Sequence, residues 1–112
     1  MKETKIGDFE ETILLIVGIL GDDAYAFRIA EEFETQTERA VSIGAVHSTL
    51  SRLEDKGFLQ SKAGMAESKR GGKPKRFFTI TAHGKEALEY NQDMRTKLWN
   101  EIPQVAWELK FA

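Results

Sequence analysis

The sequence predicts a mainly α-helical protein with a small two-stranded antiparallel β-hairpin and a long helix at its C-terminal end. A helix with a small, polar exposed face is expected to begin after Ser42. A basic turn, R-G-G-K-P-K-R from Arg70 to Arg76, separates two strand-like stretches. Apolar residues then recur at helical spacing beyond Thr81. A helix able to read a DNA groove beside a basic hairpin is typical of a winged helix-turn-helix fold.

Length and composition favour a single structural unit. The 112 residues are expected to divide into a winged helix-turn-helix part over 1–81 and a C-terminal dimerisation helix over 82–112. There is no cysteine, so the chain has neither a disulfide nor a thiolate metal site. The longest apolar run, Ile13 to Leu20, is far shorter than the roughly 20 residues that span a bilayer. No signal-peptide pattern is present, and a cytoplasmic location is expected.

The net charge of −2 hides a strong asymmetry along the chain. Residues 1–41 carry 4 basic and 10 acidic side chains, and residues 52–85 carry 9 basic and 3 acidic ones. A basic segment in an acidic chain indicates an anionic partner such as nucleic acid. A solvated hairpin with no partner is an equal alternative on charge alone.

Two helices are predicted before Ser42. Asp8, with Glu11 three residues later, is expected to cap the first one. This helix is apolar on nearly every side, which predicts cover from a partner helix of a second copy. An aspartate of the Gly21-Asp22-Asp23 break is expected to cap the second helix. Its predicted inner residues are Ala26, Ile29, Ala30 and Phe33, and Arg28, Glu31, Glu32 and Glu34 are expected to face solvent.

The third helix is the predicted DNA-reading element. Ser42 is its expected N-cap, and Lys56-Gly57 its end. Ile43, Val46, Leu50 and Leu53 should face the core. The residues expected to meet DNA are Ser42, Gly44, Ala45, His47, Ser48, Ser51 and Arg52. An ordinary solvated face is the alternative, and Arg52 is equally compatible with a phosphate contact and with an ion pair to an acidic neighbour.

The hairpin is predicted from a strand over 58–66 and a second over 76–81. In the first strand Leu59 and Met65 are expected to be the more buried members, and in the second Phe78 and Ile80 are expected to share one face. Lys73, Lys75 and Arg76 at the tip are predicted to contact the DNA backbone or the minor groove.

A long amphipathic helix is predicted from Ala82, with Thr81 as its cap and Pro103 as a kink or an end. Nothing in the sequence after it could cover its apolar stripe, so a homodimer is expected. The predicted dimer interface comprises Ile16, Leu88, Leu98, Trp99, Ile102, Val105 and Leu109. Asn91 and Arg95 on the same stripe would either fix the register or mark where the helices diverge.

Enzymatic chemistry is not expected. His47 and His83 have no carboxylate or cysteine at ligand spacing, so no metal site is predicted. No nucleophile–base pair is suggested, and Gly71-Gly72-Lys73 lacks the spacing of a phosphate-binding P-loop. We predict neither catalytic residues nor a cofactor.

Three stretches resemble the PadR family of bacterial transcriptional regulators. D-D-A-Y-A-F-R-I from Asp22 is similar to the start of that family's second helix. S-I-G-A-V-H-S-T-L-S-R-L-E from Ser42, followed by K-G-F-L, resembles its third helix. R-G-G-K-P-K-R-F-F-T-I-T from Arg70, then Gly84 and Leu88, resembles its wing. The R-L-E-x-x-G element alone is weak, but together with the wing motif it is specific.

The chain departs from the family pattern at several positions. His47 stands where the family has a tyrosine, Ala26 replaces the glycine after Tyr25, and Phe77-Phe78 replace a tyrosine pair. The change at His47 lies on the expected DNA-facing side and puts the preferred operator in doubt. The short terminal helix resembles the smaller subgroup of the family.

The resemblance implies a homodimeric DNA-binding regulator, specifically a repressor acting on a pseudo-palindromic operator. It also supports a small planar hydrophobic effector between the subunits, lined by Trp99 and Leu15. Plain interface packing is the alternative for Trp99 and Trp107. Two other readings stay open for the whole protein: a protein-binding module, and a small-molecule-binding protein without a DNA target.

Overall fold

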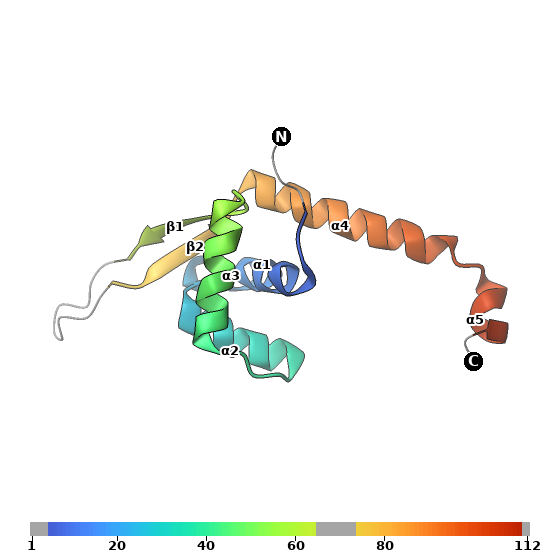
Figure 1. Ribbon diagram of the computed structural model, residues 1–112, viewed down its shortest axis with the longest axis horizontal. Coiled ribbons are helices and arrows are strands. Elements are labelled where there is room, and N and C mark those ends of the chain that lie inside the picture. Colours follow the sequence, from blue (N-terminus) through green and yellow to red (C-terminus); the bar gives the residue numbers. More distant parts are fainter. Residues whose placement is uncertain (1–4, 65–73, 111–112) are drawn as a thin grey trace.

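A computed structural model describes residues 5–64 and 74–110 of the chain, without the side chains of residues 109 and 110. Three helices form a head, a hairpin extends from one side of it, and a long helix projects from the other side (Figure 1). The elements in chain order are α1 (Asp8–Leu20), the 3-10 turn η1 (Gly21–Asp23), α2 (Ala26–Thr37), α3 (Ile43–Asp55), β1 (Leu59–Ala63), β2 (Arg76–Ile80), α4 (Ala82–Glu101) and α5 (Gln104–Lys110). The predicted winged helix-turn-helix fold is confirmed.

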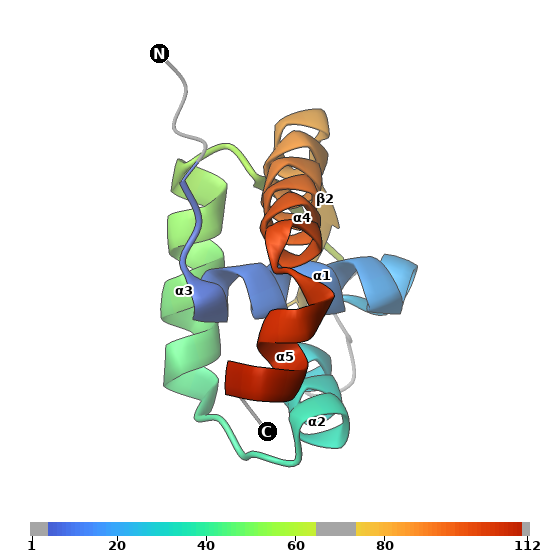
Figure 2. The same ribbon diagram turned by 90° about the vertical axis from the view of Figure 1, so that its right-hand side faces the viewer.

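α1 is the central helix of the head. It packs against α2, α3, β2 and α4 (Figure 2). Because these elements cover it from several sides, Ile13, Leu14 and Val17 are all buried within this one chain. Of the large apolar side chains of α1, only Leu15 and Ile19 remain largely exposed. The cover expected from a second copy is therefore needed on a narrower face of α1 than the sequence suggested.

The predicted caps of the first two helices are wrong. Gly7, not Asp8, is the N-cap of α1, and its N–H donates to Oε1 of Glu10, not Glu11, at 2.9 Å. Asp22 and Asp23 form η1, and the N-cap position of α2 is Tyr25, which makes no side-chain capping bond. The extended backbone of Gly7 brings its N–H to the third residue of the helix, which is the position of Glu10.

Glu32 on α2 is buried, contrary to the expectation that it faces solvent. Its carboxylate accepts hydrogen bonds from Arg28 Nη2 at 3.1 Å and from Gln36 Nε2 at 2.7 Å. These partners lie one turn before and one turn after it, so the buried charge is satisfied within α2. The predicted burial of Ile29 and Phe33 on the same helix is confirmed.

α3 begins and ends as predicted. The Ser42 hydroxyl accepts the N–H of Ala45 at 3.1 Å, and Gly57 leaves the helix with a φ of 81°. Val46, Leu50 and Leu53 are buried, but Ile43 in the first turn is exposed, which corrects its predicted place in the core. Phe58, which was not predicted to be buried, is completely buried directly after the turn.

The hairpin is antiparallel, with Leu59 opposite Ile80 and Ala63 opposite Arg76. Leu59 is buried as predicted, Phe78 is buried as well, and Met65 lies outside the described residues. The N–H of Phe78 donates to the carbonyl of Ala24 at 2.9 Å, so β2 is also joined to the segment between η1 and α2. This bond fixes the middle of β2 against the segment that leads into α2.

Thr81 caps α4 as predicted, by accepting the N–H of Gly84 at 3.0 Å. The predicted break at Pro103 is confirmed, because α4 ends at Glu101 and a separate helix, α5, begins at Gln104. Within α4 only Gly84 and Ala87 are buried, and Leu88 is half-buried against the core. None of the described helices combines the length and the apolar character needed to cross a membrane.

Candidate nucleic-acid interface

The exposed face of α3 carries small polar side chains. Gly44, Ser48 and Ser51 lie along its centre and are exposed. His47 and Glu54 lie on the side toward the hairpin, and Arg52 lies on the opposite side. Because short side chains let a helix approach another surface closely, this face can enter a groove of duplex DNA.

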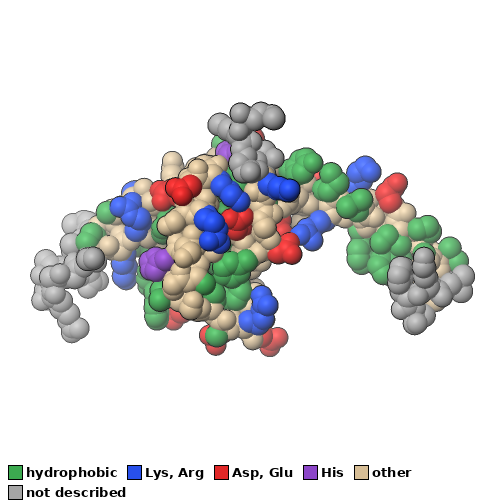
Figure 3. Space-filling view, in the orientation of Figure 1, with side chains coloured by type: hydrophobic (Ala, Val, Ile, Leu, Met, Phe, Trp, Pro, Cys, Tyr) green, Lys and Arg blue, Asp and Glu red, His purple; other side chains and the backbone are tan. Residues whose placement is uncertain are grey.

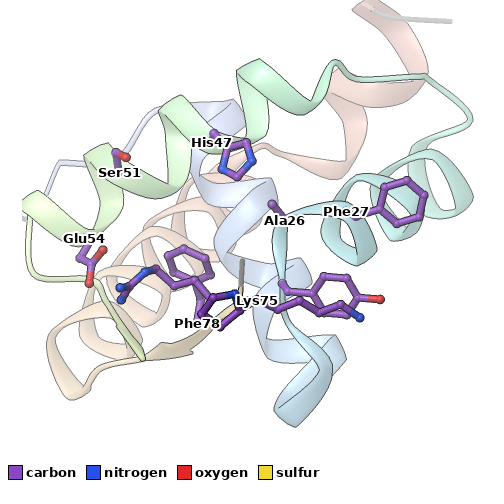
Figure 4. A pocket seen from close by; sticks show the side chains of 10 residues that line it. Ala26, Phe27, His47, Ser51, Glu54, Lys75 and Phe78 are labelled. Carbon is purple, nitrogen blue, oxygen red and sulfur yellow. The ribbon is translucent and has the colours of Figure 1, made fainter. Parts of the chain in front are cut away.

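A groove of about 440 Å³ separates α3 from β2 and the residues just before it (Figure 4). His47 and Ser51 line one wall, and Lys75 and Arg76 line the other. Four residues predicted separately from two distant stretches are therefore brought together around one concave surface. The start of α2 closes the groove with Tyr25, Ala26 and Phe27, which the sequence analysis did not assign to the site.

Two cations where the chain enters β2, Lys75 and Arg76, are held by neighbouring side chains. Lys75 Nζ lies 4.3 Å from the centre of the Tyr25 ring, a cation–π contact. Arg76 Nη1 donates to the Ser61 hydroxyl at 3.0 Å, and that hydroxyl donates to Glu54 at 2.6 Å. These contacts orient both charges along the same wall of the groove. Lys73, the third predicted cation, lies outside the described residues.

On the opposite side of α3, two further cations surround one buried carboxylate. Arg52 Nε lies 3.4 Å from Glu10 Oε2, and Lys56 Nζ lies 2.9 Å from Glu10 Oε1. Burial by itself raises the pKa of Glu10, but the N–H of Gly7 and the cations of Lys56 and Arg52 outweigh it, so the pKa lies below its usual value. Glu10 is therefore ionised at neutral pH, and the cluster of Glu10, Arg52 and Lys56 carries a net charge of +1.

The predicted site residues differ in their surroundings. Ser42 is occupied as the cap of α3, and Ala45 is half-buried. Arg52 makes the ion pair that the sequence allowed as an alternative to a phosphate contact. Lys56 was missed although it follows Arg52 by one helical turn, a spacing that places both on one side of α3. Glu10 gave no comparable signal, because it is far from α3 in the sequence.

The second candidate surface is the tail formed by α4 and α5. Leu98, Trp99 and Val105 of the predicted interface are exposed, as are Tyr90 and Met94, which the prediction omitted. Apolar side chains gather over α5 and the end of α4 (Figure 3). The Trp99 and Trp107 rings lie 5.1 Å apart between their centres, across the break at Pro103. The side chain of Leu109 is not described.

Ile16 has to be removed from the predicted interface. It is only 2% exposed, because the side of α1 that carries it faces the chain's own core. Leu15 and Ile19 are the exposed apolar residues of this helix. A surface hollow of about 400 Å³ near the end of α4 is lined by Arg95, Leu98, Trp99 and Ile102. Leu15 does not line it, so one chain does not bring Leu15 and Trp99 into a common pocket.

A three-helix head, an exposed polar helix and a hairpin with cations where its second strand begins together define a winged helix-turn-helix protein of the nucleic-acid-binding type. The sequence model of the Transcriptional regulator PadR-like family matches residues 14–90, which is more than half of the chain. The protein belongs to this family of transcriptional regulators.

Solved structures share the fold. A PadR-like transcription factor from Bacteroides fragilis is 22% identical, with a TM-score of 0.68, and the match covers 82% of this chain and 84% of the other. A PadR family transcriptional regulator from Eggerthella lenta is 19% identical, with a TM-score of 0.64 and coverages of 89% and 82%. RosR of H. salinarum is 17% identical, with a TM-score of 0.67 and coverages of 96% and 89%. A comparison with curated proteins finds no match.

Proposed function

We propose that this protein represses transcription as a homodimer bound to a pseudo-palindromic operator. In this proposal α3 enters the major groove, and the hairpin contacts the adjacent backbone or minor groove. The observation that carries it is the position of α3 between two sets of cations, Lys75 and Arg76 on one side and Arg52 and Lys56 on the other. A helix in the major groove lies between two phosphate strands, and each strand would meet one of these sets.

The tail supports the homodimer. Beyond Asn91, every residue of α4 is exposed, including Met94, Leu98 and Trp99. This apolar stripe and the exposed residues of α1 need cover, and a second copy supplies the same helix with matching length and character. Two copies joined by their tails would place two α3 helices in successive major grooves, about 34 Å apart.

The proposed homodimer also binds a small planar hydrophobic effector between its subunits. Trp99 is 64% exposed and borders the hollow at the end of α4. In a dimer, the hollows of two tails and Leu15 of a partner would enclose a planar hydrophobic molecule between the subunits. Titration of such compounds against tryptophan fluorescence tests this, with Trp99→Phe as the control. We expect saturable quenching in the natural protein and none in Trp99→Phe. If the natural protein shows no saturable quenching, the proposed effector pocket does not exist.

Selection of duplexes from a random pool tests DNA recognition directly. A recovered sequence with inverted half-sites, bound by a species of twice 12.7 kDa, is the expected result. The affinity should fall by about 0.9 log units per tenfold salt for each phosphate neutralised. If no duplex is enriched and none binds at low ionic strength, the regulator would instead act as a protein-binding module or a small-molecule binder.

A further inference from the structure

Glu10 is a buried acid of α1, on the side that meets Arg52 and Lys56 of the α3 segment. Its side chain is 10% exposed. Its carboxylate accepts the N–H of Gly7 at 2.9 Å and approaches Lys56 Nζ at 2.9 and 3.2 Å and Arg52 Nε at 3.4 Å. Contacts from three directions fix the carboxylate in place, so Glu10 can in turn fix the side chains that contact it.

Arg52 is held at two points but remains accessible. Its Nε donates to Glu10, and its Nη2 donates to the Thr49 hydroxyl at 3.1 Å. Thr49 is itself buried, and the Arg52 side chain is 55% exposed. An exposed arginine normally loses much rotamer freedom when it binds a phosphate. Here that freedom is restricted before any ligand arrives, which lowers the cost of binding.

The position of Arg52 along α3 places the restrained guanidinium beside the face that is proposed to enter DNA. Gly44, Ser48 and Arg52 follow one another at intervals of four residues and so lie along one side of the helix. The small residues of this row are those proposed to enter the major groove, and Arg52 stands at its end. A phosphate strand that borders the groove on this side would meet the guanidinium.

We propose that Glu10 is a positioning residue for DNA binding, which orients Arg52, with Lys56 beside it, toward the second phosphate strand. This inference rests on the proposed function. It makes an acidic residue necessary for tight binding to a polyanion. Charge alone leads to the opposite expectation, because removal of a negative charge near the interface should strengthen binding to DNA.

Glu10→Gln separates these two expectations. Its operator affinity, measured by fluorescence anisotropy on a selected duplex at fixed salt, should fall about 3- to 10-fold, which is the cost of ordering one or two long side chains on binding. Asp8→Asn is the matched control. It removes the same charge from the same turn of α1, but Asp8 pairs with Arg95 and not with Arg52. The affinity of Asp8→Asn should be unchanged or slightly increased.

A double-mutant cycle shows whether the effect passes through Arg52. Arg52→Gln should weaken binding, and Glu10→Gln should cause little further loss when Arg52 is already replaced. Circular dichroism gives the unfolding temperature of each variant, and all affinities are measured well below that temperature. If Glu10→Gln does not fold, Arg52→Lys tests the proposal instead. This variant keeps the positive charge but loses the two-point contact with Glu10 and Thr49, so its affinity for the operator should still fall.

The outcomes distinguish the two levels of inference. Failure of the natural protein to bind any duplex would overturn both the proposed function and the role of Glu10. Normal binding by the natural protein, with unchanged or tighter binding by Glu10→Gln, would overturn the role of Glu10 alone. An equal loss from Glu10→Gln in the Arg52→Gln background would also overturn it, because the effect would then not pass through Arg52.

Discussion

Replacement of Leu98 by alanine should weaken the proposed homodimer. Leu98 is 57% exposed on the part of α4 that lies beyond the head. Full burial of a leucine side chain is worth about 1.5–3 kcal/mol, so covering the exposed part of Leu98 contributes roughly 1 kcal/mol in each copy. Because the side chain occurs twice in a symmetric interface, Leu98→Ala should cost about 2 kcal/mol. This corresponds to a rise of about 30-fold in the dimer dissociation constant.

Sedimentation equilibrium over a range of concentrations measures this constant directly. Asn100→Ala is the matched control, because it is exposed on the same helix and points about 200° away from Leu98. It should leave the constant unchanged. The reasoning is refuted if Leu98→Ala dimerises as tightly as the natural protein, or if both variants weaken the dimer equally. A natural protein that is monomeric at all concentrations would refute the homodimer itself.

Three further predictions concern stability and DNA binding. Gly84→Ala should lower the free energy of unfolding by about 1–3 kcal/mol, since its new Cβ would collide with the Phe58 carbonyl; Gly44→Ala, whose Cβ meets open space, should not lower it. Glu10 should stabilise the fold above its ordinary pKa of 4.5 and lose that contribution as the pH falls through its lower folded-state pKa. Urea titrations at several pH values should therefore show the gap between the natural protein and Glu10→Gln closing below that pH. Lys75→Ala should weaken binding to all duplexes similarly and reduce the salt slope by about 0.9, and a loss confined to the operator would contradict a phosphate contact.

The hairpin and α3 were predictable because local signals mark them. Each of these signals affects only the residues next to it. They are the hydroxyl of Ser42, the glycine at Gly57 and the aromatic, β-branched run after Arg76. The break at Pro103 is local in the same sense, since proline removes a helical hydrogen bond wherever it stands. Local rules failed for the caps of α1 and α2, because the N-cap positions are held by Gly7 and Tyr25, neither of which makes the side-chain capping bond that marks a helix start in a sequence.

Burial was harder to predict where it depends on which face a neighbour covers. The pattern of α1 shows that it is apolar all round, but not that Ile16 faces the core while Leu15 and Ile19 face outward. Phe58 stands between a turn and a strand, where no periodicity applies, and yet it is completely buried. Only the packing of α1, α3 and α4 determines these outcomes.

The sequence by itself determined the winged helix-turn-helix class, the polar face of α3 and the basic hairpin, because each is encoded in contiguous residues. The tertiary structure decided what surrounds that face: it placed His47 and Ser51 opposite Lys75 and Arg76, and it brought Glu10 beside Arg52 and Lys56. Glu10 and Arg52 are 42 residues apart, and their contact exists only because α1 packs against α3. Electrostatic contacts over such separations leave no period or spacing in the sequence, so only the folded chain shows them.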